Sequence, residues 1–124
     1  MLFSVTNECL TCVYPHFQKY YIAPEIRAKE ESFDGHAVDI WGAGVILYIM
    51  VVGQQPWEIA EPVADFQFRM ISTGHLVDYL VHLGNVNSRL SPDLVDLLQR
   101  MFFRDPRDRL GLEQIRAHPW MNPP

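Results

Sequence analysis

Apolar residues dominate one long segment of the chain, from residue 37 to residue 52. Its apolar positions are Val38, Trp41, Val45, Tyr48 and Val52 on one helical stripe, and Ile40, Leu47 and Val51 on the other faces. A helix that is apolar all round is covered on all sides, so the pattern predicts a buried helix. The small residues at 42–44 let another backbone approach closely, at some cost in helix propensity. Gly53 and Pro56 then end the helix.

Two shorter helices are predicted next, over 63–72 and 76–83. In the first, apolar residues recur with a period of about 3.6 before the break at Gly74; they are Val63, Phe66, Met70 and Ile71. The second is a short apolar stretch that Gly84 interrupts. The pattern is less regular there than in the segment before it.

The remaining helices are predicted from their start and stop signals. Ser91, Pro92 and Asp93 are an N-cap, a first helical residue and a first-turn acid. The core positions of that helix are Leu94, Leu97, Leu98 and Met101. A last helix over 112–117 ends before Pro119. Residues 1–20 and 30–35 are predicted to be loops, so the fold class is mainly α, with about four to five helices.

Composition allows one domain and excludes several partners. The chain has 124 residues, 48% of them hydrophobic and 20% charged, which is ordinary for a globular domain. The net charge of −5 argues against a nucleic-acid binder. Residues 1–8 lack a basic start, and the apolar run over 40–52 is shorter than the roughly 20 residues that cross a bilayer. We therefore expect an intracellular, cytoplasmic protein that binds neither nucleic acid nor membrane.

Cys9 and Cys12 are spaced like half of a zinc site or a redox pair, with His16 close behind. Zinc needs four ligands, and no second close pair follows. A redox pair of this spacing follows a strand and opens a helix, which the pattern does not predict here. Two ordinary thiols on a loosely held N-terminal segment are the expectation, with no metal site.

Three groups of residues occur in a fixed order along the chain. They are Tyr21-Ile22-Ala23-Pro24-Glu25, then Asp39-Ile40-Trp41-Gly42-Ala43-Gly44, and finally Asp105-Pro106-x-x-Arg109 with His118-Pro119-Trp120. This order resembles the lower part of the helical C-terminal lobe of a eukaryotic-type Ser/Thr protein kinase domain, without its N-terminal β lobe. The resemblance extends from about Tyr21 to Met121. It implies an activation-segment-like stretch at 1–20, a partial C-lobe at 21–121 and a tail at 122–124.

The resemblance also implies structural roles for several residues. In the family, the Glu of Ala23-Pro24-Glu25 pairs with the Arg equivalent to Arg109 and ties the activation segment to the helical base. The Asp equivalent to Asp39 holds the backbone of the catalytic loop. Trp41 is expected to be a core anchor, and Gly44 completes the second motif.

The sequence departs from the family pattern where the chemistry would lie. No Gly-rich phosphate loop, no Val-Ala-x-Lys strand and no His-Arg-Asp loop occur in it. Phe33-Asp34-Gly35 and Asp65-Phe66-Gln67 only approximate Asp-Phe-Gly and follow Ala-Pro-Glu. Residues 17–19 read Phe-Gln-Lys where the family has Gly-Thr-Pro, which puts a substrate pocket of the usual shape in question. We expect no catalytic or cofactor-binding residue in this chain, although the family uses ATP and Mg²⁺.

Two functions fit these observations. The chain is either the C-lobe part of a kinase that phosphorylates protein Ser/Thr, inactive by itself, or a non-catalytic interaction module or pseudokinase remnant. In both cases a protein partner or the missing kinase half is expected. An apolar helix left partly uncovered also predicts self-association.

Overall fold

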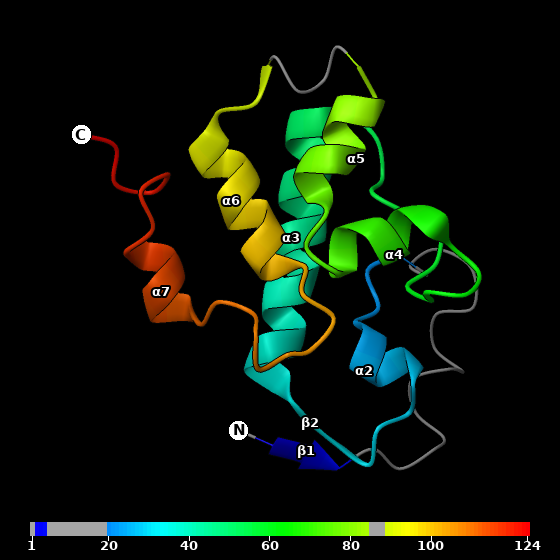
Figure 1. Ribbon diagram of the computed structural model, residues 1–124. Coiled ribbons are helices and arrows are strands. Elements are labelled where there is room, and N and C mark those ends of the chain that lie inside the picture. Colours follow the sequence, from blue (N-terminus) through cyan, green and yellow to red (C-terminus); the bar gives the residue numbers. More distant parts are fainter. Residues whose placement is uncertain (1, 5–19, 85–88) are drawn as a thin grey trace.

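The computed structural model describes residues 2–4, 20–84 and 89–124 and contains six helices and two short strands in these ranges. The elements, in order, are β1 (Leu2–Ser4), α2 (Pro24–Arg27), β2 (Ser32–Asp34), α3 (Gly35–Val52), α4 (Phe66–Ser72), α5 (Leu76–His82), α6 (Pro92–Met101) and α7 (Leu112–Arg116). Figure 1 shows α3 running through the middle of the molecule and α7 standing at the side; α6 packs on α3, and α5 packs on α4 and α6. The mainly α prediction is confirmed.

The long helix α3 begins two residues before its predicted start. The side chain of Asp34 accepts a hydrogen bond from the backbone N–H of His36 at 2.9 Å and caps the helix. At the other end, Gly53 adopts φ 87° and terminates it as predicted. Only part of the helix surface is covered, because Ile46 is 50% exposed and Met50 is 69% exposed. The pattern's prediction of burial on all sides is therefore wrong, and the expectation that part of this apolar helix is uncovered is confirmed.

By length and composition alone, α3 is the one described helix that could cross a membrane. The core helix of a globular domain meets the same criterion. Its contacts with α6 and its buried aromatic residues account for its apolar character.

The core is an aromatic cluster around Trp41. The ring centroids of Trp41 and Trp57 lie 5.0 Å apart, and Phe68 and Phe102 lie 5.9 and 5.5 Å from Trp41. These pairs are tilted or edge-on, the geometries that aromatic rings favour. The prediction of Trp41 as a core anchor is confirmed. Its three aromatic partners come from three different parts of the chain.

Close packing of α3 on α6 depends on Gly44. A Cβ atom at this position would lie 2.9 Å from the Phe102 ring and 3.1 Å from Cβ of Met101. A Cβ at Gly42 would meet nothing within 4 Å. The predicted close approach is therefore made at Gly44 and not at Gly42.

The N-terminal part differs from the prediction at three places. Residues 2–4 form β1, which pairs antiparallel with β2 in the register Phe3 opposite Phe33. The loop predictions for 1–20 and 30–35 are therefore wrong at these strands, because the pairing partner is about 30 residues away and local pattern does not reveal it. The one-turn helix α2 was not predicted either. Residues 5–19, including Cys9 and Cys12, lie outside the described residues.

The start of α4 also differs. Asp65 is the N-cap, accepting from the backbone N–H of Phe68 at 2.9 Å, so the helix begins three residues later than predicted. Val63 precedes the helix and is 91% exposed, whereas Phe68 is fully buried. The predicted stripe is therefore wrong at Val63 and Phe66, because Phe68 takes the core position. It is confirmed at Ile71, which is buried, and at Met70, which packs against the core.

The other helices match their predictions. Ser91 Oγ accepts from the backbone N–H of Leu94 at 3.2 Å and caps α6, with Pro92 at its first position. All four predicted core residues of α6 are buried. The helices α5 and α7 lie within one residue of their predicted ends.

Candidate functional site

Glu25 and Arg109 form a buried ion pair that joins two segments far apart in the sequence. The two guanidinium NH groups each donate to one carboxylate oxygen of Glu25, both at 2.6 Å. The side chain of Arg109 is 0% exposed and that of Glu25 is 6% exposed. This is the bidentate arrangement that Arg makes with a carboxylate. The contact predicted between these two residues is present.

Arg109 uses its remaining donors on backbone carbonyls. Its Nε donates to the carbonyl of Phe103 at 2.8 Å, and its two NH groups also donate to Ala37 and Arg104, both at 3.1 Å. With the two bonds to Glu25, every N–H of the guanidinium group has an acceptor. One side chain thus fixes α2, the start of α3 and the segment that follows α6.

The aromatic core supports the same guanidinium group. Its central carbon lies 4.8 Å from the ring centroid of Trp41, within the range of a cation–π contact. A buried charge without a partner is costly, and both charges here are paired and hydrogen-bonded. Removing either charged side chain would therefore leave the other charge buried without its partner.

The short helix α2 aims Glu25 at this junction. Ala23 is its N-cap, and Pro24 fills the first helical position, where a missing N–H costs nothing. Both residues are buried. The carbonyl of Ala23 accepts from the backbone N–H of Arg27 at 3.0 Å. The order Ala-Pro-Glu thus builds one turn that presents its acid inward.

Asp39 does not take part in the ion pair. It is exposed on the first turns of α3 and lines a second cavity of about 280 Å³, to which Arg109 also contributes. Among the described residues, the side chain of Asp39 makes no hydrogen bond or ion pair. Trp41 and Gly44, from the same motif, are buried in the core. Within this motif, Asp39 is therefore exposed, whereas Trp41 and Gly44 pack in the core.

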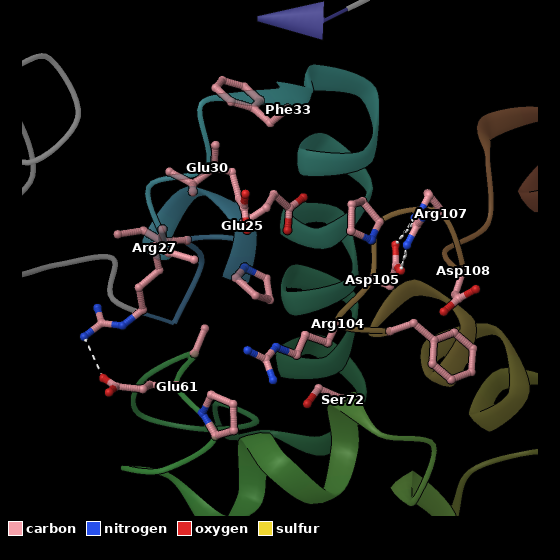
Figure 2. Close-up of a pocket in the computed structure, with 18 of the residues that line it drawn as sticks. Glu25, Arg27, Glu30, Phe33, Glu61, Ser72, Arg104, Asp105, Arg107 and Asp108 are labelled. Atoms are coloured by element: carbon pink, nitrogen blue, oxygen red, sulfur yellow. Dashed lines mark hydrogen bonds and ion pairs between the residues drawn. The ribbon is translucent and has the colours of Figure 1, made fainter. Parts of the chain in front are cut away.

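A cavity of about 1280 Å³ opens beside the ion pair. Its walls are α2, the segment 28–33, residues 60–62, the end of α4 and the segment 103–108 (Figure 2). Arg27 pairs with Glu61 across it at 3.3 Å. Sequence reasoning did not find this cavity, because its walls come together only in the folded chain.

Asp105 is held as a carboxylate at the edge of this cavity. Arg107 donates to it through its side chain, at 2.7 Å from NH2, and through its backbone N–H, at 2.9 Å. The side-chain hydrogen bond and then the backbone one lower the pKa of Asp105 to about 2. The same pairing raises the pKa of Arg107.

A second polar cluster fixes α7 to α6 and was missed by sequence reasoning. His118 is 7% exposed, and its Nδ1 accepts from the backbone N–H of Trp120 at 3.1 Å. Nε2 therefore carries the proton and donates to Asp96, 2.9 Å away, which Arg100 also contacts. Burial raises the pKa of Asp96, but the hydrogen bonds from His118 and Arg100 outweigh it and lower the pKa.

No group of three or more His, Cys, Asp or Glu side chains in the described ranges could hold a metal ion. The described residues form an anchor, the Glu25–Arg109 pair, with a cavity beside it. Its chemistry is the fixing of one segment against a helical base.

Comparison with known proteins places this geometry in a family. The protein kinase domain model matches residues 7–121. Serine/threonine-protein kinase SRK2E of Arabidopsis thaliana is 36% identical over 103 residues, which cover 81% of this chain and 26% of that protein. An abscisic acid-inducible protein kinase of Triticum aestivum is 36% identical over 104 residues, covering 81% of this chain and 29% of that protein. Serine/threonine-protein kinase SAPK2 of Oryza sativa is 36% identical over 104 residues, which cover 81% of this chain and 28% of that protein. The chain thus spans little more than a quarter of the length of these relatives.

Proposed function

The chain belongs to the protein kinase family, and we propose that it supplies the helical base of a Ser/Thr protein kinase domain, to which an ATP-binding part is fitted. The observation that carries the proposal is the five-donor junction of Arg109 with Glu25. A junction of this kind holds the end of the activation segment rigidly against the helices, which positions a protein substrate.

The reaction proposed for the assembled domain is transfer of the γ-phosphoryl group of ATP to a protein Ser or Thr. Positioning and electrostatics supply nearly all of the catalysis in phosphoryl transfer. The metal-binding acid, the phosphate-binding Lys and the catalytic-loop Asp are absent from this sequence. We therefore assign ATP and Mg²⁺ to the fitted part, and this chain is inactive by itself. A cytoplasmic location suits such an activity.

The uncovered side of α3 supports a fitted partner. Ile46 and Met50 expose apolar surface there, and Asp39 exposes a carboxylate near the start of the same helix. In the family the corresponding Asp holds the backbone of the catalytic loop. A contiguous apolar surface on a helix favours association with another protein surface.

The test is a chimeric kinase. The matched segment of Arabidopsis SRK2E is replaced by the corresponding part of this chain, and phosphorylation of a protein substrate is measured with radiolabelled ATP. Activity above the background of a chimera carrying Arg109→Ala is the expected result. Arg116→Ala is the matched control, because the Arg116 side chain makes only an exposed pair with Glu113 among the described residues.

The alternative is a non-catalytic interaction module or a pseudokinase remnant. The observation that favours it is Phe-Gln-Lys at residues 17–19, where the family has Gly-Thr-Pro. A chimera that is folded, by circular dichroism and thermal melting, yet inactive would support this alternative and contradict the kinase proposal. Calorimetry gives a separate check, since micromolar ATP binding by the chain alone contradicts the inactive state proposed for it.

A further inference from the structure

We propose that the cavity beside the Glu25–Arg109 junction is a docking site for an extended acidic segment of a partner protein, with Arg104 and Ser72 binding its carboxylate. This goes beyond the proposed function, because it requires neither ATP nor the fitted kinase part.

Arg104 is exposed and supplies an unpaired cation at the wall of the cavity. Figure 2 shows its side chain extending into the cavity, on the side where Ser72 is drawn. Among the described residues, no hydrogen bond or ion pair reaches its guanidinium group, whereas Arg27 and Arg107 in the same walls are paired. An arginine free of protein acceptors presents a fork that fits a carboxylate.

Ser72 supplies a second donor at the same place. The residue is 3% exposed, and its Oγ has no hydrogen-bond partner in the described part of the chain. A buried hydroxyl without a partner costs free energy, so an acceptor that reaches it gains that amount on binding. The backbone N–H of Arg104 donates to the Ser72 carbonyl at 3.2 Å, which keeps the two residues together.

The guanidinium group of Arg104 and the hydroxyl group of Ser72 both lack an acceptor, so the ligand is expected to supply one. The nearby acids cannot serve, because Glu25 is paired with Arg109, Glu61 with Arg27 and Asp105 with Arg107. Figure 2 shows Glu30 and Asp108 at the margins of the cavity, away from Ser72. A ligand carboxylate is therefore attracted to Arg104, and Lys29 in the same walls adds a second positive charge.

The size and lining of the cavity favour a peptide over a small anion. A volume of about 1280 Å³ lies above the roughly 300–1,000 Å³ of ordinary small-molecule sites. Apolar side chains make up much of the wall between the charged groups; they are Ile22, Ile26, Ala60, Pro62 and Phe103. Such walls accommodate apolar residues on either side of the bound acid. The ligand class is thus an acidic residue with apolar neighbours in an extended segment.

The test uses two blocked peptides, Ac-Ala-Leu-Asp-Leu-Ala-NH2 and the same peptide with Asn in place of Asp. Each is titrated into the ¹⁵N-labelled 124-residue chain, and chemical shifts of backbone amides and arginine Nε–H groups are followed. Saturable shifts at Arg104 and Ser72 with the Asp peptide are expected. Charge-assisted hydrogen bonds make binding of the Asn peptide weaker by about tenfold.

Three variants complete the test. Arg104→Gln is expected to lower affinity for the Asp peptide about tenfold and to abolish the preference for Asp over Asn. Ser72→Ala is expected to weaken binding while leaving the spectrum of the free protein dispersed. Arg116→Gln, on the exposed surface of α7, is the control and leaves affinity unchanged.

Several outcomes overturn the proposal. One is equal affinity for the two peptides, and another is full affinity in a folded Arg104→Gln variant. Absence of saturable shifts up to the solubility of the Asp peptide also contradicts it. Saturable, Arg104-dependent binding of inorganic phosphate without peptide binding would assign the cavity to a free anion instead. A failure of the kinase chimera leaves all these readouts unaffected.

Discussion

At the scale of the residue, Arg109 does more for this structure than its single position in the sequence indicates. It is 5% exposed and its donors meet one carboxylate and three backbone carbonyls. A surface arginine such as Arg116 meets one exposed acid. The difference in burial decides the energetic weight of each, because removing one member of a buried pair strands the other.

Arg109→Ala is expected to destabilise the chain by about 3–5 kcal/mol, since it leaves the Glu25 carboxylate buried and unpaired. Arg116→Ala is the matched control and is expected to cost under about 1 kcal/mol. Urea unfolding followed by circular dichroism measures both. The double variant Glu25→Gln with Arg109→Leu is expected to recover part of the loss, and an Arg109→Ala variant as stable as the control would contradict the anchoring role.

At the scale of the element, the packing of α3 on α6 and the attachment of α7 depend on single residues. Gly44 allows the first contact, because the Phe102 ring occupies the space that a side chain would take. His118 and Asp96 make the second contact. Helix propensity alone disfavours Gly44, so packing overrides it at this position.

Gly44→Ala is expected to destabilise the chain by about 1–3 kcal/mol, because the new methyl group overpacks the contact with α6. Gly42→Ala, two residues away in the same helix, is expected to stabilise it by about 0.5–1 kcal/mol, since it meets nothing and improves helix propensity. Thermal melts of the two variants give opposite signs. Equal shifts would show that backbone propensity and not packing governs this segment.

The attachment of α7 is expected to weaken in acid. The pKa of Asp96 in the folded chain lies below its ordinary value of 3.8, so its contribution to stability is complete above about pH 3.8 and is lost as the pH falls through the lower folded-state pKa. The melting point of Asp96→Asn should therefore be lower than that of the unaltered chain at pH 6, and the gap should close at strongly acid pH. Glu113→Gln, which removes an exposed pair, is the control with little difference at either pH. A difference in melting point that grows in acid would contradict this prediction.

At the scale of the whole molecule, one helix organises the chain and is left partly open. Figure 1 shows α3 at the centre, and α6 packs along it. Trp41, Val45 and Tyr48 face the core, while Ile46 and Met50 are exposed. Because α3 is central and one of its apolar faces is exposed, the chain by itself is expected to associate with another protein surface.

The chain alone is expected to self-associate at micromolar concentration through this face. Ile46→Ser combined with Met50→Ser removes exposed apolar surface without touching the buried positions, so the variant should remain folded and shift toward monomer. Multi-angle light scattering after size exclusion measures the mass. Val63→Ser is the control, because Val63 is 91% exposed and lies outside α3. A clean monomer of the unaltered chain would contradict the expectation.

Local patterns in the sequence determined the helices and most of their ends. Ser91-Pro92 starts α6 and Gly53 ends α3, because capping and left-handed backbone conformation depend on neighbouring residues only. The ordered motifs also indicated the pairing of Glu25 with Arg109 through family resemblance. The capping and helix-ending signals act on neighbouring residues, so they can be read from a single sequence.

Only the tertiary structure decided which surfaces are covered and what they form. It buried Phe68 in place of Val63, left Asp39 and Met50 exposed, and paired β1 with β2. It also placed Arg104 beside Ser72, which lies 32 residues earlier in the sequence. Neither side chain has a hydrogen-bond acceptor among the described residues. The physical reason is that burial and hydrogen-bond partners depend on which distant segments meet, and the periodicity of one segment carries no record of its neighbours.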